Sequence, residues 1–178
     1  MHKFAREMAF YSAYHQQSTN IWIHVLGVPL ITFTAFVPLC WLSLFELGGV
    51  PVTAASLLYL YSVQHYLRTD LFFGVIASLF YGALLFIAHQ TAGLGYLPGA
   101  LIFAAGQIIG WTAQIWGHLH FEKNRPAFFE SIHQSFISAP LFVIADLFFH
   151  FGWRQDLQQA VREELADSGR LREFSAAS

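Results

Sequence analysis

The stretch over residues 24–121 carries only three formally charged side chains, Glu46, Arg68 and Asp70. The apolar runs in this stretch include several segments near the roughly 20 residues that a helix needs to cross a bilayer. In the whole chain, 56% of residues are hydrophobic and 11% are charged, whereas soluble domains are about one quarter charged. The sequence therefore predicts a multi-pass membrane helical bundle of the all-α class.

A single integral membrane domain is expected over residues 1–178, in three parts. Residues 1–18 predict an interfacial amphipathic helix, because large side chains recur on one face at helical spacing. The membrane bundle follows at residues 21–153, and residues 154–178 are expected to be a cytoplasmic tail with a soluble helix. The face of the first helix is formed by Phe4, Met8, Tyr11 and His15.

Inside the bundle, four long spans are expected, followed by a re-entrant or broken helix pair over residues 127–153. Pro29 and Pro38 are expected to kink the first span. The pair is expected to break near Ser138–Pro140. The four spans are predicted at about residues 21–45, 51–66, 71–89 and 98–121.

Charge predicts which side of the membrane each turn faces. Lysine and arginine gather at the amino end, in the second and fourth turns and in the tail, whereas the first and third turns have none. All basic segments then lie in the cytoplasm, provided that the broken pair returns to the side that it left. The cytoplasmic helix ends then carry His15, His24, His65, His118, His120 and Glu122.

Several classes of protein are excluded by features that the sequence lacks. It has no basic stripe of the kind that nucleic acid requires. Cys40 is the only cysteine, which excludes an intrachain disulfide and a cysteine-based zinc or iron–sulfur site. The sequence contains neither a His-x-x-His-His box nor a Gly-x-Ser-x-Gly elbow, so di-iron hydroxylase and serine hydrolase chemistry are not expected.

Three histidines stand where apolar helices begin or end. His15 and His24 are nine positions apart, which places them on opposite sides of a straight helix. A break at residues 17–20, which are good N-cap material, would allow both to serve one site with His118. A single histidine there is most simply explained by a hydrogen bond to a carbonyl at the lipid interface. Three that converge from several helices indicate an iron or zinc site.

A fourth metal ligand is expected from His120, with His65, Glu122 or solvent as alternatives. Glu122 follows His118 by four positions, so both share a helix face. Glu122 is therefore either a carboxylate ligand or an acceptor that orients a ligating histidine.

Further polar residues near the histidines are expected to have supporting roles. Asn20 and Gln114 are expected to be hydrogen-bond donors behind the ligands, because amides bind divalent transition metals weakly. Lys123 and Arg125 follow Glu122 in the chain and either bind a substrate at the site or face phospholipid headgroups.

The fourth span carries two neighbouring stripes at helical spacing. The polar-aromatic stripe contains Gln107, Trp111, Gln114 and His118. The other stripe consists of small residues, on which a second helix can approach closely, and it is assigned no chemistry. Its members are Gly106, Gly110, Ala113 and Gly117.

Two motifs together resemble those of a known family. The first contains Tyr14-His15, Asn20, His24 and Gly27-Val28-Pro29. The second contains Gln114, Gly117-His118, Phe121-Glu122-Lys123 and Pro126-Ala127, and is followed by Ala139-Pro140-Leu141-Phe142. Over about residues 10–150 the chain resembles the family of the endoplasmic-reticulum 2-hydroxy fatty acid dioxygenase of phytosphingosine breakdown, which has many bacterial relatives.

This resemblance implies an iron(II)-dependent dioxygenase that shortens a 2-hydroxy fatty acid by one carbon in α-oxidation. The family's motif histidines carry over to His15, His24 and His118 as holders of Fe(2+), and with Glu122 they form the expected catalytic set. The expected partners are a 2-hydroxy long-chain fatty acid, O₂ and the lipid bilayer. The expected location is a bacterial inner membrane, or the endoplasmic reticulum in a eukaryote, with the site at the cytoplasmic side.

A non-enzymatic role is the competing hypothesis. The chain would then be a lipid-binding or carrier-type membrane protein, whose histidines bind a metal for stability only. Carriers usually show internal repeats with matched broken helices, and the sequence contains no such repeat.

Overall fold

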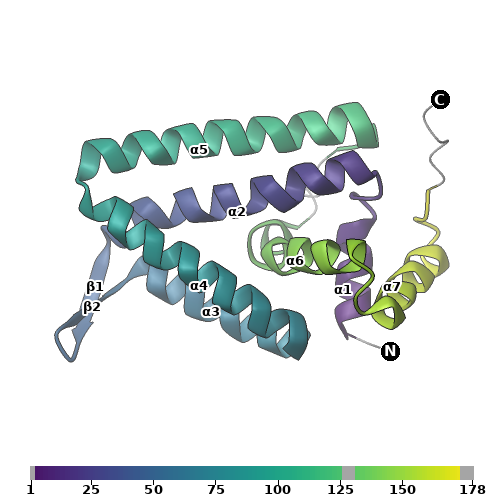
Figure 1. Ribbon diagram of the computed structural model, residues 1–178, viewed down its shortest axis with the longest axis horizontal. Helices are drawn as coiled ribbons and strands as arrows, with labels where there is room; N and C mark the ends of the chain where they lie inside the picture. Colours follow the sequence, from purple (N-terminus) through teal and green to yellow (C-terminus); the bar gives the residue numbers. More distant parts are fainter. Residues whose placement is uncertain (1–2, 126–130, 173–178) are drawn as a thin grey trace.

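A computed structural model describes residues 3–125 and 131–172 and is mostly helical (Figure 1). Helices α2 and α5 run side by side, α3 and α4 form a second pair, and α1 and α7 lie together near the two ends of the chain. The elements in chain order are α1 (Lys3–Ser12), α2 (Ser18–Cys40), β1 (Ser43–Leu47), β2 (Val50–Thr53), α3 (Ala54–Thr69), α4 (Leu71–Gly93), α5 (Tyr96–Gly117), the π-helical segments η1 (His118–Glu122) and η3 (Gln134–Ser138), α6 (Ala139–His150) and α7 (Gln155–Asp167).

Three helices in the described part are long and apolar enough to cross a membrane, namely α2, α4 and the continuous helix Tyr96–Glu122. Large apolar side chains point outward from these helices: Leu79, Phe86 and Ile108 are 72%, 65% and 67% exposed. Such surfaces indicate a membrane protein. The prediction of four long spans is not confirmed, because α3 has 16 residues and reaches only about 24 Å at 1.5 Å per residue.

The all-α class is confirmed, and a short β-hairpin is added to the helices. The first span was expected to continue to Phe45, but α2 ends at Cys40 and the antiparallel strands β1 and β2 follow it. Gly48 and Gly49 form the turn with φ of 59° and 80°. Two consecutive residues with positive φ are what a tight two-residue hairpin needs, and glycine adopts them without steric cost.

The predicted break near Ser138–Pro140 is also corrected. Residues 134–150 form one continuous helix, in which Pro140 stands in the first turn of α6. Pro140 thus lies where the π-helical segment η3 passes into α6, and the helix does not end there. The chain instead bends by 116° between α6 and α7, where Gly152 and Arg154 both have positive φ.

The residues of the predicted tail take part in the core. Leu157, Val161 and Leu165 are buried on one face of α7, which packs on α1. On the other side of α1, the ring of Phe4 lies 5.4 Å from that of Phe73 and 5.9 Å from that of Phe142. Helix α1 is therefore enclosed by α4, α6 and α7.

Helices α2 and α5 pack closely along the predicted ridge of small residues. A β-carbon added at Gly106 would overlap the side chain of Thr34, and one added at Gly117 would overlap Asn20. Glycine at these two positions therefore allows the helices to approach. The contact holds the start of α2 against the end of α5, where two of the predicted site histidines lie.

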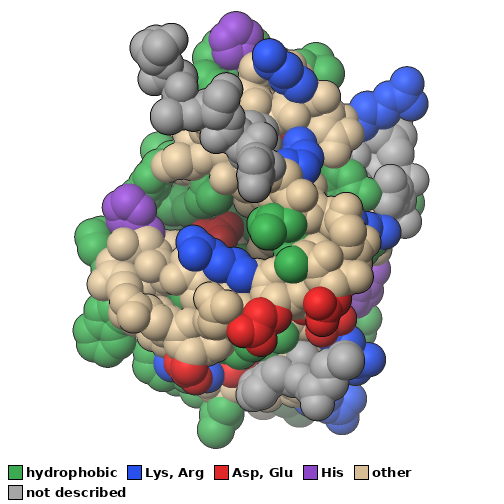
Figure 2. Space-filling view, turned by 90° about the vertical axis from the view of Figure 1, so that its right-hand side faces the viewer, with side chains coloured by type: hydrophobic (Ala, Val, Ile, Leu, Met, Phe, Trp, Pro, Cys, Tyr) green, Lys and Arg blue, Asp and Glu red, His purple; other side chains and the backbone are tan. Residues whose placement is uncertain are grey.

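One end of the molecule is distinctly polar. Charged side chains gather over the face that contains α1 and α7 (Figure 2), whereas the β-hairpin lies at the opposite end (Figure 1). An integral membrane protein with this distribution presents the polar end to one aqueous compartment.

Reporter fusions test this topology. A reporter fused after Ser178, which lies outside the described residues, is expected to report the cytoplasm, and one inserted at Gly48 is expected to report the opposite side. The physical reason is the basic residues at the α1 and α7 end. Reporters on the same side in both fusions would contradict the topology.

Candidate metal centre

Three buried histidines from different segments meet at the polar end of the bundle. The ring centroid of His15 lies 4.2 Å from that of His24 and 4.7 Å from that of His118, and His24 and His118 are 4.7 Å apart. One nitrogen of each ring lies within 4.8 Å of the other two. Within residues 3–125 and 131–172, no other group of three His, Cys, Asp or Glu side chains meets this condition.

The chain reverses between His15 and His24, as the sequence required. Helix α1 ends at Ser12, earlier than the predicted helix, so His15 lies in the turn before α2. Gln17 caps α2 by accepting a hydrogen bond from the Thr19 amide at 3.0 Å. His24 then lies in the second turn of α2, and His118 begins η1 directly after α5.

Hydrogen bonds to the backbone fix the ring nitrogens of two of these histidines. His15 Nδ1 lies 2.8 Å from the Tyr11 carbonyl oxygen, and His24 Nδ1 lies 2.9 Å from that of Asn20. A carbonyl can only accept, so both Nδ1 atoms carry the proton and both Nε2 atoms keep a lone pair. A carbonyl partner behind a ligating histidine is a common arrangement in metal sites.

The cluster also contains buried nitrogens that the protein leaves unsatisfied. His15 Nε2 and His118 Nδ1 are buried and have no hydrogen-bond partner among the described residues. A buried polar atom without a partner costs free energy unless a ligand satisfies it. The cluster therefore fits a metal ion held by imidazoles.

The protonation state of His15 also suits a metal ligand. Burial lowers the pKa of His15 well below its ordinary value, and the neighbouring His24 and His118 lower it further. Metal binding requires the neutral imidazole. His15 is therefore already in the binding form at neutral pH.

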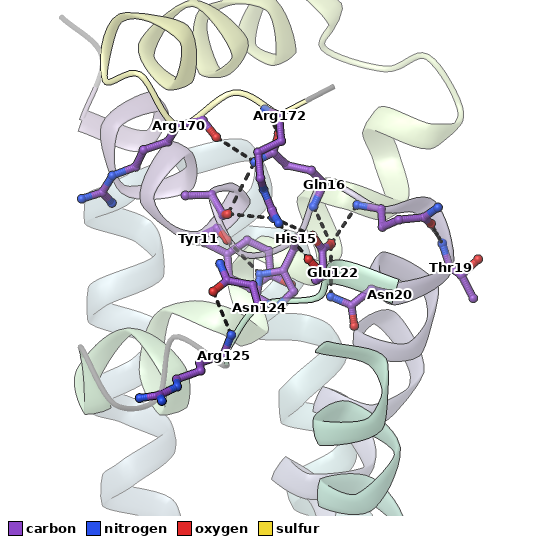
Figure 3. Close-up of polar contacts among 12 residues, drawn as sticks. Tyr11, His15, Gln16, Thr19, Asn20, Glu122, Asn124, Arg125, Arg170 and Arg172 are labelled. Atoms are coloured by element: carbon purple, nitrogen blue, oxygen red, sulfur yellow. Dashed lines mark hydrogen bonds and ion pairs between the residues drawn. The ribbon is translucent and has the colours of Figure 1, made fainter. Parts of the chain in front are cut away.

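Glu122 is buried beside the cluster but does not belong to it. Its Oε1 accepts hydrogen bonds from the Gln16 amide at 2.7 Å, the Gln17 amide at 2.8 Å and Asn20 Nδ2 at 3.3 Å (Figure 3). Its Oε2 lies 2.6 Å from Arg172 Nη2. Both oxygens are thus engaged by the turn around His15 and by the chain end, and Glu122 bonds to no histidine ring in the described structure.

Two other predicted residues, Asn20 and Gln114, lie near the histidines. Asn20 contributes its carbonyl oxygen to His24 and its amide to Glu122. Gln114 is buried against Gly27 of α2, where an added β-carbon would lie 3.1 Å from Gln114 Nε2. Gln114 also lines a cavity of about 50 Å³ beside the three histidines.

His120 is not brought to the cluster, which corrects its assignment as the fourth ligand. It lies two positions from His118 and so points to the other side of the helix, where it is exposed and its ring stacks on Trp116. The alternative ligand His65 is also elsewhere, with its Nε2 2.9 Å from Ser138 Oγ.

The predicted substrate-binding cations are likewise displaced from the site. Lys123 is exposed and ends η1 with a left-handed φ of 49°. Arg125 is exposed and points away from the histidines in Figure 3. The cation that does reach the site is Arg172, which the sequence pattern did not indicate.

An apolar cavity lies next to the histidines on the membrane side. It measures about 310 Å³ and shares four lining residues with the small cavity beside the rings. Aromatic and aliphatic side chains of α2, α3 and α5 form most of its wall. The shared residues are Val28, Trp111, Gln114 and Ser135.

Metal analysis of four single variants tests the cluster. His15→Ala, His24→Ala and His118→Ala should each lose most of the approximately one iron per chain expected after anaerobic loading, because each removes a ligand. His120→Ala should keep its iron, since that ring stacks on Trp116 outside the cluster. Full occupancy in the first three variants would make these histidines structural, and loss in His120→Ala would restore it as a ligand.

Comparison with known proteins identifies the family of the chain. Residues 1–151 match the model of the Mpo1-like family, described as 2-hydroxy-palmitic acid dioxygenase Mpo1-like. The chain is 30% identical over 159 residues to the 2-hydroxy-palmitic acid dioxygenase MPO1 of Saccharomyces cerevisiae, covering 89% of this chain and 87% of the yeast protein. No solved structure matches the chain. With its three motif histidines gathered at one buried point, the chain belongs to the Mpo1-like family.

Proposed function

We propose that the protein is an iron(II)-dependent dioxygenase that cleaves 2-hydroxy fatty acids to a product one carbon shorter. The observation that carries this proposal is the cluster of His15, His24 and His118, which is buried and lies beside an apolar cavity. The name of the yeast relative supports the substrate class, since that protein is a dioxygenase of 2-hydroxy-palmitic acid.

In this proposal His15, His24 and His118 hold the iron through neutral nitrogens. Bound Fe(2+) would supply O₂ activation and a site for the two oxygens of a 2-hydroxy carboxylate, with imidazole ligands that suit it. The protein's own contribution is to fix the rings through the Tyr11 and Asn20 carbonyls.

The neighbouring cavity is suited to the acyl chain. Its volume of about 310 Å³ lies at the lower end of the range for ligand pockets, roughly 300–1,000 Å³. Residues of its wall include Phe36, Tyr59 and Tyr66, so the wall favours hydrocarbon and excludes water. A fatty acid in this cavity would have its polar head at the histidines, where the two cavities adjoin.

The overall conversion balances without an external reductant. A 2-hydroxy acid and one O₂ contain the atoms of an acid one carbon shorter, one CO₂ and one water. The C1–C2 bond breaks, the former C2 is oxidised to the new carboxyl group, and C1 leaves as CO₂. The substrate itself therefore supplies all the electrons that reduce O₂.

Oxygen consumption tests the activity. Protein loaded with iron under anaerobic conditions and then given 2-hydroxy-palmitic acid and air should consume O₂ and form an acid or aldehyde one carbon shorter. Palmitic acid should give no reaction, because it lacks the 2-hydroxyl oxygen that binds the iron together with the carboxylate. The His118→Ala variant is the protein control. Bound iron without turnover for any chain length would favour the non-enzymatic lipid-binding alternative.

The role of Glu122 makes a separate prediction. Glu122→Gln keeps the shape and an acceptor oxygen for the Gln16 and Gln17 amides but removes the negative charge. Iron should be retained, and activity should fall by about 10–100-fold, as for other groups outside the ligand set, because Glu122 supports the turn that holds His15. Iron content and oxygen consumption measure the two effects, and an iron-free variant would instead make Glu122 a ligand.

A further inference from the structure

Arg172 follows the region that matches the family model, residues 1–151, and yet it contacts the buried Glu122 beside the histidines. We propose that Arg172 is a positioning residue of the metal centre, which acts through Glu122 and the turn at residues 13–17 to hold His15 in place. The inference rests on the proposed function only in taking His15 as a metal ligand.

His15 depends on its surroundings more than the other two histidines. His24 lies within α2 and His118 begins η1, so the backbone hydrogen bonds of a helix hold both. The His15 amide donates to the Ser12 carbonyl at 3.0 Å, but Gln16 and Gln17, which follow it, lie outside any helix. Contacts from other parts of the chain must therefore hold this turn.

Glu122 supplies the central contact. A single carboxylate oxygen accepts from the Gln16 amide at 2.7 Å and from the Gln17 amide at 2.8 Å, the two residues that directly follow His15. The side chain of Glu122 is fully buried, with 0% of its surface exposed. A carboxylate in such a place is costly unless a cation and hydrogen bonds compensate it.

Arg172 compensates this charge and binds the turn at the same time (Figure 3). Its Nη2 donates to Glu122 Oε2 at 2.6 Å and to the Ala13 carbonyl at 3.1 Å, while Nη1 donates to the Glu122 carbonyl at 3.0 Å. In the described residues it is the one basic side chain within ion-pair distance of Glu122. The planar guanidinium serves three acceptors together, which the ammonium of lysine cannot do in the same geometry.

The segment over residues 170–172 is itself held against the turn. Gln16 donates through Nε2 to the Arg170 carbonyl at 2.9 Å, and Gln16 Oε1 accepts from the Arg172 amide at 2.8 Å. Because α7 also packs on α1, the position of this helix places Arg172 beside the site. Residues on both sides of His15 are thus bound either to Arg172 or to its partner Glu122.

Cobalt(II) titration tests this role without reference to turnover. Arg172→Ala should lower the affinity for Co²⁺, read from the visible absorption of the bound ion, by about 10–100-fold. Arg162→Ala removes the same charge from an exposed position on α7 and should leave the affinity within about twofold. In a His15→Ala background, Arg172→Ala should add little further loss, because both changes act through one ligand.

Two further variants keep the test decisive if Arg172→Ala unfolds. Arg172→Lys retains the charge but not the three-way contact and should lose affinity to an intermediate degree. Adding Glu122→Gln to Arg172→Ala should restore folding and part of the affinity, since no buried charge is then left unpaired. Co²⁺ affinity unchanged in Arg172→Ala and Arg172→Lys, or a loss equally large with and without His15, would overturn the proposal.

The result of the Co²⁺ titration can be distinguished from the result of the activity test. Reduced Co²⁺ affinity in Arg172→Ala supports the positioning role even if the parent protein turns over no 2-hydroxy acid. Turnover that is normal in both the parent and Arg172→Ala, with equal metal affinity, would reject the positioning role and leave the dioxygenase assignment intact.

Discussion

Helix α5 can approach α2 closely because glycines replace larger side chains along the line of contact. This approach sets the separation of His24 and His118, which lie far apart in the sequence. Every other part of the site is added to this pair. The turn before α2 places His15 beside this pair, and the Asn20 carbonyl fixes His24. The larger cavity is lined mostly by α2, α3 and η3. A loosened contact between the two helices would therefore disturb the site before it disturbed the fold.

Much of the fold could be predicted from the sequence, because length and apolarity determine which segments form long helices. The long helices lie close to where hydrophobic runs predicted them. The hairpin at residues 43–53 could not be recognised in the same way, because its strands continue the apolar run of α2 and only Gly48-Gly49 marks the turn. The bend after α6 was misplaced because Pro140 was taken as the break, although the helix continues through it from η3 into α6.

The candidate site could be predicted wherever local spacing decides the geometry. His15, His24 and His118 were identified from their positions at helix ends, and the structure brings them together. His120 was misjudged because it lies close to His118 in the sequence but on the other side of the helix. Arg172 could not be found at all: its contact with Glu122 joins residues 50 positions apart, and no periodic pattern links them. Only the packing of α7 on α1 creates that contact.

The π-helical winding of η1 has a consequence for how this protein can change over evolution. A π-turn holds one more residue than an α-turn, and this extra residue lies between the histidine cluster and the carboxylate of Glu122. Deletion of a single residue there would convert the π-turn to an α-turn and change the position of Glu122 relative to His118. The intervening Leu119 and His120 are both exposed, so other side chains can replace them. Natural selection should therefore conserve the number of residues in this interval more strictly than their kind.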